Sequence, residues 1–239
     1  MTATEFRSGS PARCPHLIFD LDGTLTDPRE GILRCFQYAL TRLGADVPDE
    51  AALERHIGPP LRDTLRELLP GREPEVERAV EIYRERFAPI GMFENRVYAG
   101  IPELLESLVD AGRTLHLCTS KAHPFARRIL EHFGLDRFFA SIHGSELDGT
   151  RNDKRELLAH LRDREALASA SCLMLGDRRF DVEAATQCGV ASVGVLWGYG
   201  SRSELEAAGA TWLAESPQDL SALLIPELRV SGAAPASGA

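Results

Sequence analysis

Residues 16–27 have the sequence HLIFDLDGTLTD, and the architecture can be inferred outward from them. The first part, HLIF, is a short continuous apolar run, which is typical of a strand buried on both faces of a parallel sheet. Asp20 and Asp22 follow two positions apart, so both carboxylates leave the end of this strand in the same direction. Gly23 then lets the chain turn sharply. Because open parallel sheets bind ligands beyond the carboxyl ends of their strands, we expect a functional site here.

Two other interpretations of the aspartate pair are weaker. A polar loop with capping residues would leave two carboxylates unpaired at a buried edge, which costs free energy. An EF-hand calcium loop that starts at Asp20 needs glycine at its sixth position and glutamate at its twelfth. Leu25 and Gly31 stand at these positions, so the EF-hand interpretation fails.

Strand and helix patterns alternate along most of the chain. Further apolar runs predict strands at 115–118, 172–175 and 191–196, and a strand is expected near 139–142. Helical periodicity is found at 101–111, 124–133, 153–165, 180–187, 203–208 and 217–224. This alternation predicts an α/β fold, with a Rossmann-like parallel sheet that carries helices on both faces.

The segment between the first two strands breaks this alternation. It contains four helical patterns and no strand, at 28–43, 49–56, 60–69 and 73–88, separated by glycine and proline. The pattern predicts an inserted all-helical cap domain at residues 28–97, and a core domain made of residues 14–27 and 98–228. Residues 1–13 and 229–239 are small or polar and are predicted to be disordered.

Composition excludes several functional classes. The chain has 239 residues, of which 44% are hydrophobic and 26% charged, as in ordinary globular proteins. Its 27 basic and 36 acidic residues give a net charge of −9 without a basic run, which argues against binding to nucleic-acid polymers or anionic membranes. No run approaches the ~20 apolar residues of a membrane span, and no secretory signal is recognisable. We therefore expect a cytoplasmic protein, either a monomer or a homodimer. The five scattered cysteines favour neither a disulfide framework nor a zinc site.

A second acidic motif follows the strand predicted at 172–175. Asp177 lies at the end of that strand, and Asp181 lies where the next helix begins; either could simply be a helix N-cap. If they converge with Asp20 and Asp22, four negative charges need a cation to remain ionised together. A set of oxygen ligands with room for water predicts Mg2+ rather than zinc.

Polar residues also follow the other strands. Thr119, Ser120 and Lys121 come after the strand at 115–118, where hydroxyl and backbone donors could bind a phosphate, although an ordinary turn would have the same residues. Lys154 opens a helix, a position where its charge opposes the helix dipole, which suggests a carboxylate or phosphate partner. Lys121 and Lys154 are the two lysines among 27 basic residues. Apart from chance, a site that requires a compact ammonium group would explain both.

Together these motifs resemble the haloacid dehalogenase-like superfamily of phosphohydrolases. The motifs D-x-D-G-T-L-T at 20–26 and G-D-x-x-x-D at 176–181 are highly specific, and the resemblance covers about residues 15–225. IGPPLRDTL, GSELDGTRNDK and LGDRRFDV resemble the phosphoglycolate phosphatase-like branch, which includes bacterial 5′-nucleotidases. The resemblance implies that the first strand is central, between the second and the fourth.

The resemblance also implies roles for individual residues. Asp20 would be the nucleophile that forms an aspartyl-phosphate, and Asp22 the acid/base. The dehalogenases of the superfamily lack the second aspartate, so Asp22 argues against carbon–halogen chemistry. The expected Mg2+ ligands are Asp20, the backbone carbonyl of Asp22, Asp177, and Asp181 directly or through water. The expected phosphate-binding residues are Thr119, Ser120 and Lys154.

Substrate choice is expected to depend on the cap. Gly58 and Arg62 resemble a cap loop that faces the substrate, and with Lys121 they are candidate specificity residues; Arg62 could pair with a second anionic group or could be an ordinary exposed arginine. We expect a Mg2+-dependent phosphatase for small phosphomonoesters, with phosphoglycolate first and nucleoside 5′-monophosphates close behind. A phosphosugar mutase and a receiver-like module that retains its phosphoryl group are the remaining alternatives.

Overall fold

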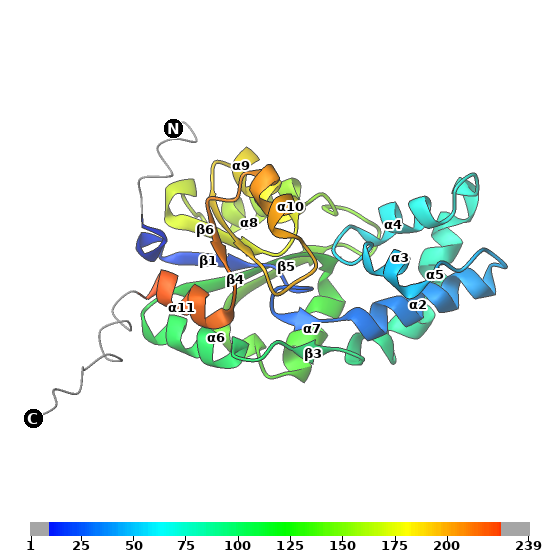
Figure 1. Ribbon diagram of the computed structural model, residues 1–239, viewed down its shortest axis with the longest axis horizontal. Helices are drawn as coiled ribbons and strands as arrows, with labels where there is room; N and C mark the ends of the chain where they lie inside the picture. Colours follow the sequence, from blue (N-terminus) through cyan, green and yellow to red (C-terminus); the bar gives the residue numbers. More distant parts are fainter. Residues whose placement is uncertain (1–9, 226–239) are drawn as a thin grey trace, which may run out of the picture.

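The computed structural model describes residues 10–225 and is built on a six-stranded parallel sheet (Figure 1). The strand order is β5-β4-β1-β6-β7-β8, and every neighbouring pair is parallel. The strands are β1 (His16–Phe19), β4 (Thr114–Ala122), β5 (Phe139–Ser145), β6 (Cys172–Gly176), β7 (Ala191–Val195) and β8 (Trp212–Ala214). The predicted central position of the first strand, between the second and fourth core strands, is confirmed.

Leu17, Ile18 and Phe19 of β1 are all apolar because they pack into the hydrophobic layers on both faces of the sheet. Leu17 and Phe19 point to one face of the sheet, while Ile18 points to the other, and all three are fully buried. Each residue pairs in register with β4 on one side and β6 on the other. A strand placed between two helical layers has no solvated face, which explains why its apolar residues do not alternate with polar ones.

Helices cover both faces of the sheet, so the predicted α/β class is confirmed. The core helices are α6 (Ile101–Asp110), α7 (His123–His132), α8 (Lys154–Arg164), α9 (Arg179–Gln187), α10 (Arg202–Ala208) and α11 (Pro217–Leu224). Helices α8 and α9 bury Leu157, Leu158 and Ala185 on the face of Ile18. Helices α6, α7 and α11 pack on the opposite face (Figure 1).

Four further helices lie together beyond one end of the sheet (Figure 1). They are α2 (Arg29–Arg42), α3 (Glu50–Glu54), α4 (Leu61–Leu68) and α5 (Val76–Phe87), with short 3-10 helices at Glu73–Glu75 and Gly91–Phe93. All fall within the segment predicted as the cap. A two-stranded antiparallel ribbon, β2 (Thr26–Asp27) with β3 (Arg96–Val97), joins this segment to the core at both of its ends. The ribbon was not predicted because each strand has only two residues.

Some sequence-based expectations need correction. The predicted disorder of residues 1–13 is wrong for Pro11–Arg13, which form a 3-10 helix with Pro11 buried. Arg113 holds this turn by donating hydrogen bonds to the backbone carbonyls of Ala12 and Cys14. Strand β8 was not predicted, because three residues are too few to show a repeating pattern of apolar side chains. The predictions for residues 1–9, for the core boundary at 226–228 and for the tail at 229–239 lie outside the described residues. Between residues 10 and 225, no helix is long and apolar enough to cross a membrane.

Candidate active site

The turn after β1 brings Asp20 and Asp22 to the edge of the sheet, both nearly inaccessible to solvent. The Asp20 backbone N–H donates to the Leu175 carbonyl at 2.9 Å, which continues the pairing with β6 past the end of the strand. Gly23 has a φ of +82°, and a Cβ there would overlap the Asp177 carboxylate. Glycine is therefore required both by the backbone conformation and by the close approach of the two strand ends.

Three of the predicted carboxylates converge at this edge. Asp177 follows β6 and Asp181 lies in the first turn of α9, and both are buried. One carboxylate oxygen from each of Asp20, Asp177 and Asp181 lies within 4.8 Å of the other two. The Asp177 Oδ2 accepts a hydrogen bond from the Tyr199 N–H at 2.8 Å, which fixes the orientation of its carboxylate. The carboxyl of Asp22 is not part of this cluster.

Lys154 supplies a positive charge to the cluster. Its Nζ lies 2.7 Å from Asp20 Oδ1 and 2.8 Å from Asp181 Oδ1. Burial acts against its charge, but the attraction of Asp181 and Asp20 outweighs burial and raises the pKa of Lys154, so the ammonium stays protonated. The predicted carboxylate partner of this unusual first-turn lysine is thereby found.

One ammonium does not balance three buried carboxylates. Burial raises the pKa of Asp177 well above its usual value, and the charges of Asp181 and Asp20 add to this effect. Burial also raises the pKa of Asp181 to about 6, although Lys154 opposes the rise. Three clustered carboxylates with one ammonium therefore favour additional positive charge at this site.

The donor set fits a divalent cation. Carboxylate oxygens within mutual reach of one ion are ligands that Mg2+ accepts, and backbone N–H groups hold two of the three side chains, Asp177 and Asp181. Asp20, Asp177 and Asp181 would hold the ion, which would neutralise charge between an anionic nucleophile and an anionic substrate. Participation of the Asp22 backbone carbonyl remains a prediction.

Thr119, Ser120 and Lys121 lie in the last part of β4, which extends further than the sequence predicted. Thr119 is buried, and its Oγ1 accepts a hydrogen bond from the Lys121 N–H at 3.3 Å. Thr119 and Ser120 line a pocket together with Asp20 and Asp22, so the predicted phosphate-binding hydroxyls lie beside the predicted nucleophile. Their role as phosphate ligands remains a prediction.

Lys121 contacts the second aspartate of the motif. Its Nζ lies 2.7 Å from Asp22 Oδ2 and 4.6 Å from the centre of the Phe87 ring on α5. The other oxygen, Asp22 Oδ1, is buried and has no hydrogen-bond partner among residues 10–225. Burial raises the pKa of Asp22, whereas Lys121 opposes this rise. Asp22 is therefore suited to carry a proton, as an acid/base requires.

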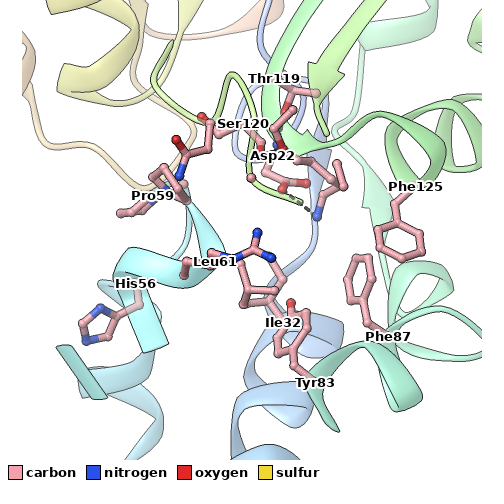
Figure 2. Close-up of a pocket in the computed structure, with 18 of the residues that line it drawn as sticks. Asp22, Ile32, His56, Pro59, Leu61, Tyr83, Phe87, Thr119, Ser120 and Phe125 are labelled. Atoms are coloured by element: carbon pink, nitrogen blue, oxygen red, sulfur yellow. Dashed lines mark hydrogen bonds and ion pairs between the residues drawn. The ribbon is translucent and has the colours of Figure 1, made fainter. Parts of the chain in front are cut away.

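Asp22 and its neighbours line a pocket that is bounded by both the core and the cap segment (Figure 2). Asp22, Thr119 and Ser120 occupy its core side, while Tyr83 and Phe87 of α5 approach from the cap side. The apolar and aromatic residues that line it are Ile32, Phe36, Pro59, Pro60, Leu61, Tyr83, Phe87, Ala122 and Phe125. Sequence reasoning missed this aromatic wall, although Tyr83 and Phe87 are spaced four residues apart on one helix face.

The two cap residues proposed for specificity both line the pocket. Arg62 donates to Glu77 from Nε at 2.7 Å and from Nη2 at 3.0 Å, and Nη2 also lies 3.2 Å from the Leu147 carbonyl. The two N–H groups with which Arg62 could bind a substrate anion are thus already bound to a carboxylate of the protein itself. Gly58 has a φ of +112°, and a Cβ there would lie 3.1 Å from Arg178 Cγ.

Arg178, which the sequence analysis did not single out as a site residue, joins the core to the cap loop. Its Nη1 donates to the Ile57 carbonyl, and its Nε donates to Glu204 at 2.9 Å. Because Arg178 directly follows Asp177, the strand end that carries a candidate metal ligand also holds the loop at Gly58.

Comparison with known proteins agrees with this geometry. A family model described as haloacid dehalogenase-like hydrolase matches residues 17–195, which include all four aspartates, Thr119 and Lys154. The chain belongs to this family. A solved structure of a predicted phosphatase from Clostridium acetobutylicum superimposes on the hydrolase with a TM-score of 0.85 and 39% identity, covering 88% of this chain and 98% of that one.

Curated relatives of this haloacid dehalogenase-like hydrolase have several names. A 5′-nucleotidase of Pseudomonas aeruginosa is 55% identical over 195 residues, which are 82% of this chain and 88% of the relative. The tyrosine-protein kinase PtkA of Mycobacterium tuberculosis is 40% identical over 206 residues, or 86% of this chain and 70% of the relative. Phosphoglycolate phosphatases also match, at 26–32% identity. The family, these phosphatases and the structural neighbour identify the chain as a phosphoric monoester hydrolase.

Proposed function

We propose that the protein is a Mg2+-dependent phosphatase that hydrolyses nucleoside 5′-monophosphates through an aspartyl-phosphate on Asp20. The observation that carries the substrate class is that one pocket is lined both by Asp20 and Asp22 and by the aromatic rings of Phe87 and Phe125. A two-carbon acid such as phosphoglycolate offers no apolar surface to this wall, whereas a nucleoside does. The likeness to a 5′-nucleotidase supports the same choice.

The reaction requires an oriented nucleophile. Lys154 binds Asp20 Oδ1, which orients the carboxylate and leaves Oδ2 to attack phosphorus. The bond from Oδ2 to phosphorus forms while the bond from phosphorus to the leaving oxygen breaks. Thr119 and Ser120 donate hydrogen bonds to the non-bridging oxygens in this proposal.

Proton transfer falls to Asp22. In the first step its carboxyl donates a proton to the leaving alkoxide, and in the second it takes a proton from the water that attacks the aspartyl-phosphate. The ion pair with Lys121 fixes the orientation of this side chain in the wall of the pocket. Mg2+ held by Asp20, Asp177 and Asp181 would reduce the repulsion between nucleophile and phosphate.

Phosphate release tests the proposal. The purified protein is assayed with nucleoside 5′-monophosphates, phosphoglycolate and a hexose phosphate, with Mg2+ and with excess chelator. We expect nucleotide hydrolysis that requires Mg2+ and a phosphoprotein intermediate that hydroxylamine cleaves. Asp20→Asn should abolish turnover and leave the unfolding transition cooperative.

Other outcomes would reject parts of the proposal. Hydrolysis of phosphoglycolate without nucleotide turnover would reject the substrate class but not the chemistry. Phosphoryl exchange between substrate positions would indicate a mutase. A long-lived phosphoprotein without release of phosphate would indicate a receiver-like module.

A further inference from the structure

Arg84, on α5, is a pocket residue whose hydrogen-bonding capacity is largely unused. Its Nη2 donates to the Leu147 carbonyl at 2.9 Å. Its Nε is buried and has no hydrogen-bond partner among residues 10–225. Within the same part of the chain, no carboxylate lies within ion-pair distance of its guanidinium. A guanidinium has five N–H donors, so an acceptor could still bind here.

Arg62 provides a contrast within the same pocket. Both arginines donate to the Leu147 carbonyl, but Arg62 also has a two-point ion pair with Glu77. Burial lowers the pKa of Arg84, and the nearby charge of Arg62 lowers it further. The buried Nε is closed to a ligand, but the terminal Nη1 is not among the buried unpaired atoms and has no hydrogen-bond partner among residues 10–225, so a ligand acceptor can pair with the end of the guanidinium.

The surroundings of Arg84 restrict what that ligand can be. Tyr83 and Phe87 on the same helix stack with ring centres 5.4 Å apart, and Phe87 meets Phe125 edge to face at 5.3 Å. Figure 2 shows these three rings on one side of the pocket. Tyr83 and Phe87 stack on each other, and Lys121 lies over the Phe87 ring. A group that reaches Arg84 therefore lies among aromatic edges and apolar side chains, which suits a flat ring that has acceptors on its edge.

We propose that Arg84 selects the base of the substrate by donating hydrogen bonds to a 6-oxopurine, so that IMP and GMP are hydrolysed in preference to AMP. This inference rests on the proposed function and specifies its substrate class. Arginine pairs well with the adjacent O6 and N7 acceptors of a 6-oxopurine. Adenine has an amino group at the same edge, and a side chain that only donates cannot pair with a donor.

The first test compares substrates on the unaltered protein. IMP, AMP and purine-riboside 5′-monophosphate share phosphate and ribose and differ at position 6 of the ring. We expect kcat/KM for IMP to exceed that for either other nucleotide by about tenfold or more, the range of one good two-point contact. Equal kcat/KM values for IMP and AMP would overturn the inference without affecting the proposed function.

The second test assigns the preference to Arg84. In Arg84→Gln, the ratio of kcat/KM for IMP to that for AMP should fall towards one, mainly through KM for IMP. The matched control is Arg78→Gln on the same helix, since Arg78 is exposed and pairs with Glu81 outside the pocket. The control should keep the original ratio. A ratio unchanged in Arg84→Gln would overturn the assignment.

Further outcomes distinguish a folding defect of the variant, a failure of the proposed function and a failure of the role of Arg84. If Arg84→Gln does not fold, as judged from its thermal unfolding, the substrate comparison on the unaltered protein still decides whether a 6-oxo group is selected. If no nucleotide is hydrolysed but phosphoglycolate is, the proposed function fails and the base preference fails with it. Nucleotide hydrolysis without any base preference refutes only the role of Arg84.

Discussion

Replacing Lys154 by methionine should destabilise the metal-free protein strongly. The Lys154 side chain is 6% exposed, and the change keeps its length but removes the ammonium that pairs with Asp20 at 2.7 Å and Asp181 at 2.8 Å. Removal of one partner from a buried ion pair costs about 3–5 kcal/mol, because the remaining charges stay desolvated. With a total stability of roughly 5–15 kcal/mol for a typical domain, the variant should still fold, though with a small margin.

Urea unfolding near neutral pH in excess chelator measures this loss as a lower free energy of unfolding. Added Mg2+ should restore part of it, since a ligand at 100 times its dissociation constant contributes about 2.7 kcal/mol. The matched control is Arg155→Met at the next position, where the side chain is 55% exposed. A loss below about 1 kcal/mol in Lys154→Met would show that the ammonium does not offset the carboxylates, and so contradict the reasoning.

Three other substitutions test separate parts of the site and fold. Asp22→Asn should slow hydrolysis of alkyl phosphates by about 10²–10⁴-fold but that of activated aryl phosphates much less, because only alkoxides need the proton; equal losses in kcat would contradict the acid role. Gly23→Ala should reduce Mg2+-dependent turnover by more than about tenfold, since the new Cβ overlaps the Asp177 carboxylate at a φ of +82°, and unchanged metal titration of activity would refute this. Burial, aided by His16, lowers the pKa of His116 to about 4. The native state therefore loses stability as pH falls from about 6.5 to 4 while the unfolded chain takes up a proton, by up to about 3 kcal/mol. His116→Gln should show less of this acid loss in urea titrations at several pH values, and an identical pH dependence would reject the assignment.

Much of this protein follows from local sequence. The apolar runs of β1 and β6 predict buried parallel strands, and the aspartates after them must then meet, because parallel strands end at the same edge of a sheet. Convergence of Asp20 with Asp177 was therefore predictable without coordinates. The helices of residues 28–97 could also be predicted from the sequence, because the spacing of their apolar residues is a local property.

Which charged side chains pair with one another was decided only by the tertiary structure. Arg62 and Arg84 have the same side chain and line the same pocket, yet Arg62 is paired with Glu77 while Arg84 keeps donors free. Arg62 was predicted as a specificity residue and Arg84 was not, because no pattern along the chain shows which carboxylate a long side chain will reach. Likewise, Lys121 meets Asp22 and Phe87 only after segments distant in sequence pack together. Local periodicity determines the elements, whereas charge pairing depends on distances that exist only in the folded chain.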